Sequence, residues 1–327
     1  MRKTQARHAS RESGLPATAS IHIVPRMMRT FFAFALLVIF DLPAMAASSG
    51  LIAFERGTRI FVASIDGPGA RAIAKGSAPD LSPDGSRIAF HTDNSTGKNL
   101  VRQIAVADVA TKQVTVFKKE MPSENCQRAV WSPDGAHILF EIWTDNDWHV
   151  AMINADGSGF RYVKKATPPR NSFWSTCWAP DGKSIYAQDL TNLYQFGLDG
   201  TEMKKWSLHS LFPKGSMSSG SSMAVSPDGK TFLIDIDMDE EEANMPDWDG
   251  PPPSLWMLEI ASQKATRLSP KGVLAWHGCW LNSKEILFTS QSAKEKEPTI
   301  YRMNIAEKDR KAVLKNANNP SASRSAN

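Results

Sequence analysis

The stretch Trp131-Ser132-Pro133-Asp134-Gly135 is one copy of a five-residue element that recurs along the chain. Serine at the first position of a β-turn bonds to nearby backbone, and proline fixes φ at the second. Aspartate suits the third position, and glycine tolerates the positive φ of the fourth. Each copy therefore predicts a tight turn between two strands. The other copies are Leu81-Ser82-Pro83-Asp84-Gly85, Trp178-Ala179-Pro180-Asp181-Gly182, Val225-Ser226-Pro227-Asp228-Gly229 and the degraded Trp280-Leu281-Asn282-Ser283-Lys284.

The copies are spaced 47 to 55 residues apart, which is the length of one four-stranded propeller blade. An apolar triplet such as Ile138-Leu139-Phe140 follows each turn. Continuous apolar triplets are typical of strands that are buried on both faces. Two further strands follow in each repeat, so the sequence predicts an all-β protein made of four-stranded blades.

The two ends of the repeat region complement each other. Residues 51–74 supply three strands with no inner strand ahead of them, whereas Asn319-Pro320-Ser321-Ala322-Ser323-Arg324 is similar to the segment that begins at Ala78. We expect the carboxy-terminal segment to provide the missing inner strand and close the ring, which removes open sheet edges. The 281 residues after residue 46 divide into six repeats, so residues 47–327 are predicted to form one six-bladed β-propeller.

The amino-terminal part of the sequence has the features of an export signal. Phe31 to Phe40 form an apolar run that precedes the small-residue box Ala44-Met45-Ala46. Because this run is too short to span a membrane, residues 1–46 are predicted to be a signal segment cleaved near Ala46. Translation is expected to start at Met27 or Met28. The predicted location is the periplasm or the medium, with no membrane span after cleavage.

The formal charge of +4 belongs to this signal segment, because residues 47–327 contain 32 basic and 32 acidic residues. A neutral domain gives no electrostatic basis for binding nucleic acid or an anionic membrane surface. We therefore predict that the partner is neither of these.

The combination of W-S-P-D-G, I-x-F and a strand ending in D-G resembles the TolB-like propeller repeats of the PD40 type, which are similar to WD40-like repeats. The resemblance covers residues 50–327, without the separate amino-terminal domain of TolB itself. It implies a monomeric, non-catalytic module that binds a protein or peptide in the periplasm. The alternative is a propeller-scaffold enzyme, such as a lyase or hydrolase acting on a carbohydrate or lactone.

The sequence contains no G-x-S-x-G or H-E-x-x-H motif, so no catalytic residue is predicted. The expected inner strands carry mostly small, uncharged residues, which favours the binding module over the enzyme.

Longer connections between strands share one face of the predicted ring, which we call the long-loop face, and the tight turns share the opposite face, the turn face. Aromatic residues in exposed loops are enriched at binding sites, although several of the ten tryptophans must belong to the core. The partner-binding residues predicted on the long-loop face are Trp148, His149, Trp174, Asp247, Trp248, Asp249, Trp276 and His277.

An acidic segment begins at Asp235, and its first three acids, Asp235, Asp237 and Asp239, alternate. Alternating residues of a strand share a face, and clustered carboxylates suit Ca²⁺. The segment lacks the residue frame of a calcium loop. We therefore predict no metal or other cofactor, with Ca²⁺ as a weak candidate. A recognition loop for a basic partner and a plain solvated loop are the other interpretations of this segment.

Three cysteines raise the possibility of a disulfide in an exported protein. Cys177 and Cys279 occupy equivalent positions two blades apart, and Cys126 is displaced along its strand. The sequence therefore favours three free thiols.

Overall fold

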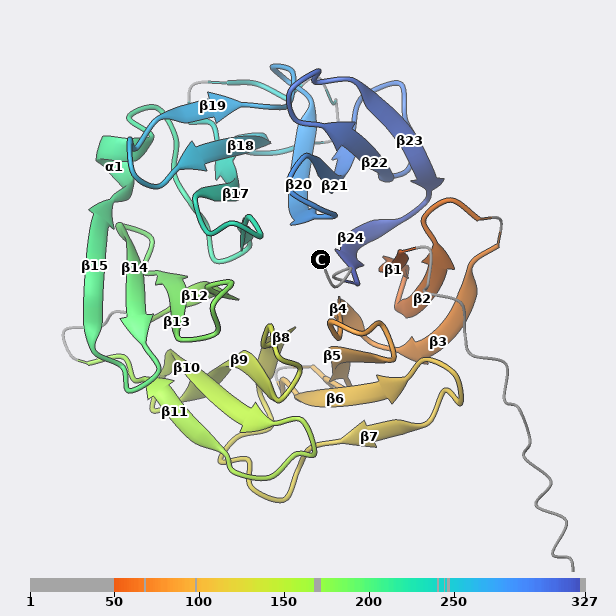
Figure 1. Ribbon diagram of the computed structural model, residues 1–327, viewed down its shortest axis with the longest axis vertical. Coiled ribbons are helices and arrows are strands. Elements are labelled where there is room, and N and C mark those ends of the chain that lie inside the picture. Colours follow the sequence, from red (N-terminus) through yellow and green to blue (C-terminus); the bar gives the residue numbers. More distant parts are fainter. Residues whose placement is uncertain are drawn as a thin grey trace, which may run out of the picture. The chain divides into compact units, whose positions relative to one another are not determined.

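The computed structural model describes residues 50–323, except 68, 98, 168–171, 240, 244, 246 and 247. In this part of the chain, six four-stranded antiparallel sheets surround a central axis (Figure 1). The predicted six-bladed β-propeller is therefore confirmed. The signal segment predicted for residues 1–46 lies outside the described residues.

The blades are numbered in chain order, and the strands of each blade run from the innermost to the outermost. Blades 1 to 3 are β24 (Asn318–Ala322), β1 (Leu51–Arg56), β2 (Arg59–Ser64), β3 (Arg71–Lys75); β4 (Ser77–Leu81), β5 (Arg87–Asp93), β6 (Arg102–Asp108), β7 (Val114–Val116); and β8 (Cys126–Trp131), β9 (His137–Thr144), β10 (Asp147–Asn154), β11 (Arg161–Lys164). Blades 4 to 6 are β12 (Trp174–Trp178), β13 (Ser184–Gln188), β14 (Asn192–Gly197), β15 (Glu202–Ser207); β16 (Met223–Val225), β17 (Thr231–Asp237), β18 (Pro253–Glu259), β19 (Ala265–Arg267); and β20 (Leu274–Trp280), β21 (Glu285–Gln291), β22 (Thr299–Asn304), β23 (Arg310–Lys315).

A four-residue helix, α1 (Leu208–Leu211), lies between blades 4 and 5. In the described part of the chain, no helix has the length and apolar character needed to cross a membrane.

The recurring element forms the turn between the first and second strands of a blade. In blade 3, Ser132 Oγ donates to Asp134 Oδ1 at 2.5 Å and accepts from His137 N at 2.9 Å. The same aspartate oxygen accepts from Ala136 N at 3.0 Å, and Gly135 has a φ of 69°. Equivalent bonds hold the turns at Ser82 and Ser226. Serine and aspartate thus satisfy the backbone groups that the turn leaves free.

The ring closes through β24, which lies beside β1 in Figure 1 and pairs Ala322 with Ile52. Ser323 N donates to Leu51 O at 2.9 Å, and Leu51 N donates to Ser323 Oγ at 3.1 Å. These are the two bonds that Ser132 forms with His137 in a continuous turn. Leu51 and Ser323 therefore form the hydrogen bonds of a turn although they are not joined by a turn segment.

The core lies between neighbouring blades, where the apolar triplets after the turns are buried. The tryptophans of the recurring element belong to this packing. Trp178 Nε1 donates to Val130 O in blade 3 at 3.2 Å, and Trp280 Nε1 donates to Ala224 O in blade 5 at 3.2 Å. Trp178 and Trp280 thus both fill the interface and hydrogen-bond the preceding blade, whereas the buried Trp131 Nε1 has no hydrogen-bond partner among the described residues.

Candidate functional site

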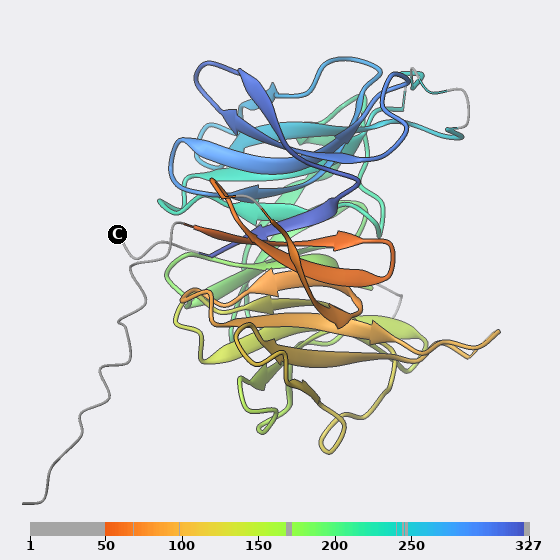
Figure 2. The same ribbon diagram turned by 90° about the vertical axis from the view of Figure 1, so that its right-hand side faces the viewer.

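A cavity of about 330 Å³ opens at the axis on the long-loop face, and we call it the mouth cavity. The β5–β6 connection, gold in Figure 2, projects on this side of the ring. The sequence predicted inner strands of mostly small, uncharged residues, and the cavity lining also includes polar and charged side chains from other strands. The cavity is lined by side chains of the inner strands and also by side chains of second and third strands, such as His91 of β5 and Arg102 of β6. Its lining includes His91, Arg102, Gln127, Arg128, Ser175 and His277.

A ring of polar side chains, which we call the polar ring, surrounds this end of the channel. Each member directly follows the apolar triplet on the second strand of its blade. Five members pair with the inner strand, and Asp235 N donates to Ser222 O, just before β16, at 3.2 Å. Apart from the partly buried histidine, all are nearly inaccessible to solvent. The members are Glu55, His91, Glu141, Gln188, Asp235 and Thr289.

The three acids of the polar ring satisfy backbone groups of the neighbouring blade. Within the described residues, five inner strands have a bulge beside the ring, where one residue has a positive φ, for example Ser175 at 57°. A bulge frees backbone N–H groups from the ladder. Glu55 accepts from Ala78 N, and Glu141 Oε1 accepts from Thr176 N at 3.3 Å. Acids in blades 1 and 3 thus bind the bulges of blades 2 and 4.

Asp235 of blade 5 accepts from Ser222 N at 2.8 Å and Ser222 Oγ at 2.7 Å, just before the inner strand of its own blade. The backbone of His277 in blade 6 also hydrogen-bonds Asp235. Burial raises the pKa of Asp235 to about 7, against the opposing effect of these hydrogen bonds. Burial also raises the pKa of Glu55 and of Glu141.

The raised pKa of Asp235 makes stability depend on pH. Between the ordinary value of 3.8 and about 7, the folded chain keeps a proton on Asp235 that the unfolded chain has lost. Stability should therefore fall as the pH rises through this window, by up to about 1.4 kcal/mol per pH unit. We expect Asp235→Asn to flatten this decline in urea-unfolding midpoints measured at pH 5 and pH 7. Identical pH dependence in the two proteins would contradict the prediction.

Arg128 lies across the mouth cavity and holds the connection between blades 4 and 5. We call residues 216–222 of this connection the serine loop. Arg128 Nη1 donates to Ser221 O at 2.6 Å, and Nη2 donates to Gly220 O at 2.7 Å. Its Nε lies 4.0 Å from Glu141 Oε2. One guanidinium therefore joins the polar ring to the serine loop.

Each of the three acids considered for Ca²⁺ hydrogen-bonds a serine side chain of the serine loop. Asp235 binds Ser222, Asp237 binds Ser218, and Asp239 Oδ1 accepts from Ser216 Oγ at 3.0 Å. Asp235 and Asp237 lie on β17 and Asp239 follows its end, and each binds a serine. Among the described residues, no group of three or more His, Cys, Asp or Glu is placed to hold a metal ion.

Of the residues predicted to bind a partner, Trp148 lies beside the mouth cavity. It is partly exposed, and its ring contacts Trp143 at a centroid distance of 5.6 Å and Arg102 at 5.4 Å. His149, the next residue, points the other way because neighbouring residues of a strand alternate. It is 2% exposed, and its Nδ1 accepts from Ala166 N at 2.9 Å. His149 is therefore a core residue of blade 3.

Trp276 and His277 lie together on β20, where Trp276 Nε1 donates to Asn318 Oδ1 at 2.9 Å. His277 lines the mouth cavity, and burial together with the charge of Arg128 lowers its pKa to about 3. Trp174 is partly buried at the start of β12.

The acidic segment brings a separate aromatic to the surface. Trp248 is 41% exposed, and Asp249 beside it is exposed. Asp247 lies outside the described residues. The structure thus collects Trp148 and His277 at the mouth cavity and leaves Trp248 on its own loop.

The channel continues on the turn face as a second cavity of about 320 Å³. Its wall is mostly apolar, with Pro133, Pro180 and Pro227 of the turns, and also includes Asp80 and Ser321. Cys177 and Cys279 also line it, and all three cysteines are free thiols.

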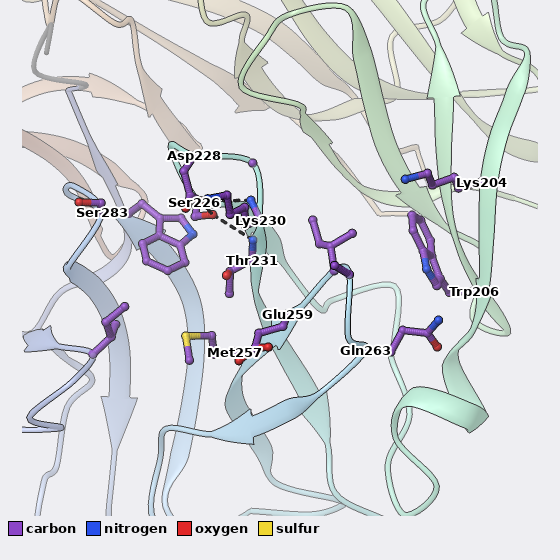
Figure 3. Close-up of a pocket in the computed structure, with 15 residues that line it drawn as sticks. Lys204, Trp206, Ser226, Asp228, Lys230, Thr231, Met257, Glu259, Gln263 and Ser283 are labelled. Carbon is purple, nitrogen blue, oxygen red and sulfur yellow. Dashed lines mark hydrogen bonds and ion pairs between the residues drawn. The ribbon is translucent and has the colours of Figure 1, made fainter.

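A larger hollow, the rim cleft, lies at the edge of the turn face with a volume of about 810 Å³. Lys204 and Trp206 of β15 form one wall, opposite Lys230 and Thr231 (Figure 3). The cleft arises because the outer strand of blade 4 forms a wall beside the turns of blade 5, an arrangement that turn composition does not encode.

No protein-family model and no curated protein matches the sequence. Solved structures match the fold. TolB from Acinetobacter baumannii aligns with a TM-score of 0.60 and 14% identity, over 85% of this chain and 67% of that chain. A putative TolB from Agrobacterium tumefaciens gives 0.57 and 14%, over 83% and 90%. A chain of a nidogen/laminin complex gives 0.59 and 11%, over 84% and 98%. At these identities the likeness establishes a TolB-like propeller fold and no activity.

Proposed function

We propose that this protein is an exported, non-catalytic propeller that binds a protein or peptide partner at its long-loop face. The observation that carries the proposal is the mouth cavity, an open hollow at the ring axis lined by Arg102 and Arg128. Trp148 stands beside it, stacked on Arg102. Tryptophan and arginine are the residues most enriched at the energetic centres of protein interfaces.

Two further features support a binding role. The cavity wall rests on backbone groups that buried acids hold in place, so the site is rigid before a partner arrives, which lowers the entropy lost on binding. One of the similar solved structures comes from a complex of two proteins, nidogen and laminin.

The proposal is tested by capture from a periplasmic extract on immobilised wild-type protein, with quantification by mass spectrometry. We expect Trp148→Ala to reduce recovery of the partner by about tenfold or more, because interface tryptophans commonly contribute over 2 kcal/mol. Trp206→Ala, in the rim cleft on the opposite face, is the matched control and should retain the partner. Equal recovery by wild type and Trp148→Ala, or loss in the control alone, would contradict the proposal.

A further inference from the structure

Arg102 is held in a fixed position at the mouth cavity by neutral groups. Its Nε and Nη2 donate to Asn125 Oδ1 at 3.0 and 2.7 Å, and its Nη1 donates to Gln127 Oε1 at 2.8 Å. The guanidinium also stacks on Trp148. Both amides come from the start of blade 3, and Gln127 is itself fixed by Glu141 at 2.8 Å. The orientation of the guanidinium is therefore set before any ligand binds.

Arg102 keeps unused capacity for binding. A guanidinium has five N–H groups, and three are accounted for by these bonds. Among the described residues, no carboxylate lies within ion-pair distance of Arg102. Three other partly buried arginines do have such a partner, namely Arg128 with Glu141, Arg267 with Glu241, and Arg302 with Glu285. The partly buried Arg56, Arg87 and Arg310 resemble Arg102 in having no ion-pair partner among the described residues.

Arg102 lies among charges of both signs. Arg128 lines the same cavity, and both guanidiniums contribute to lowering the pKa of His91, to about 4, after the larger effect of burial. Asp93, the cross-strand neighbour of Arg102, opposes this effect on His91, and its own pKa is lowered by hydrogen bonds from Ser95 and by the charge of Arg102. The His91 Nδ1 atom is buried and has no hydrogen-bond partner within the described part of the chain. The acids of the polar ring, by contrast, are already bound to backbone N–H groups of the next blade.

We propose that the mouth cavity binds a carboxylate of the partner, taken up by the free N–H groups of Arg102. A planar guanidinium that is stacked on an aromatic ring and keeps N–H groups beyond those bound to Asn125 and Gln127 suits a carboxylate. The inference rests on the proposed peptide-binding function and specifies its chemistry. The carboxylate comes from a chain terminus or from an Asp or Glu side chain.

The test is an NMR titration of protein labelled with ¹⁵N-arginine, following the Nε–Hε signal of Arg102, which is identified by its absence in Arg102→Gln. Three probes are used: N-acetyl-Ala-Ala-Ala with a free carboxylate, the same peptide as its amide, and N-acetyl-Ala-Asp-Ala-amide. We expect at least one carboxylate probe to shift this signal and to bind about tenfold or more tightly than the neutral amide. The first and third probes separate the terminal from the side-chain source.

Arg87→Gln is the matched control, since Arg87 also stacks on a tryptophan, Trp131, with 4.6 Å to the ring centroid. The Arg87→Gln variant should respond to the three probes as the wild-type protein does. In Arg102→Gln, the other signals that respond to the probes should no longer distinguish the carboxylate probes from the amide. Acid and amide acting alike on the wild-type protein would overturn the inference, even if Arg102→Gln fails to fold. Equal partner recovery by wild type and Trp148→Ala, together with a preserved response to the acid probes, would contradict the proposed partner binding and leave the carboxylate site standing.

Discussion

A chain that lacks residues 318–327 is expected to lose cooperative folding. The deletion removes β24, the inner strand of blade 1, and with it the ladder to β1. It also removes side-chain bonds to other blades: Ser321 with Asp80 and with the Leu81 backbone, and Asn318 with Trp276. At about 1 kcal/mol per bond, before any apolar burial, the loss approaches the net stability of about 5–15 kcal/mol for a domain.

Urea unfolding followed by circular dichroism would measure this effect. A second truncation, ending at Ser323, keeps every bond named above and should unfold cooperatively with a midpoint close to that of the full chain. Closure by β24 would be refuted as a stability requirement if the longer deletion unfolded at the same midpoint as the shorter one.

Glu141→Ala is expected to cost about 3–5 kcal/mol, the range for removing one member of a buried charged pair. Glu141 is fully buried. Without its carboxylate, Arg128 loses its counter-charge, and the Thr176 backbone and the Gln127 side chain lose an acceptor. Glu141→Gln keeps the shape and one acceptor oxygen, so it should cost only about 1–2 kcal/mol.

Glu259→Ala provides the comparison, because Glu259 is an exposed acid that accepts from the Ser262 hydroxyl, and surface changes typically stay within about 0.5 kcal/mol. The free energies of unfolding are compared from urea titrations. If Glu141→Ala proved no more costly than Glu259→Ala, the polar ring would not join the blades in the way that its hydrogen bonds indicate.

Much of the fold could be predicted because its determinants are local. A Ser-Pro-Asp-Gly turn depends on four adjacent residues, and its spacing counts the blades. Ring closure was also predictable, because Ser321 and Ser323 repeat the local pattern of Asp80 and Ser82. The bulges were not, since a positive φ at Ala78, Arg128 or Ser175 follows from contacts with the next blade and not from these residue types.

The site was predicted only in part for the same reason. Trp148, which the sequence placed on the long-loop face, lies beside the mouth cavity, whereas Arg102 and His91 reach the cavity from strands that the sequence places behind the inner one. An acid directly after an apolar triplet, as in Phe54-Glu55 and Phe140-Glu141, was the available signal for the polar ring. Such an acid inside a buried strand requires partners, which in this fold are the freed N–H groups of the bulges.

The weak Ca²⁺ candidate in the acidic segment rested on the alternation of Asp235, Asp237 and Asp239. In the structure these carboxylates hydrogen-bond Ser222, Ser218 and Ser216, and Asp239 lies beyond the end of β17. The residue pattern within one segment does not show which other segment packs against it in the tertiary structure. The serine loop, which in the sequence is only a connection rich in serine and glycine, is what takes up these carboxylates.

The hydrogen bonds between Leu51 and Ser323 have a topological consequence. Because they reproduce those of a continuous turn, a short Pro-Asp-Gly link could join the two positions without moving either strand. The chain could then be reopened at another turn, such as the one at Ser132, to give a circular permutant with the same blades. The order in which the blades occur along the polypeptide is therefore separable from the architecture that they build.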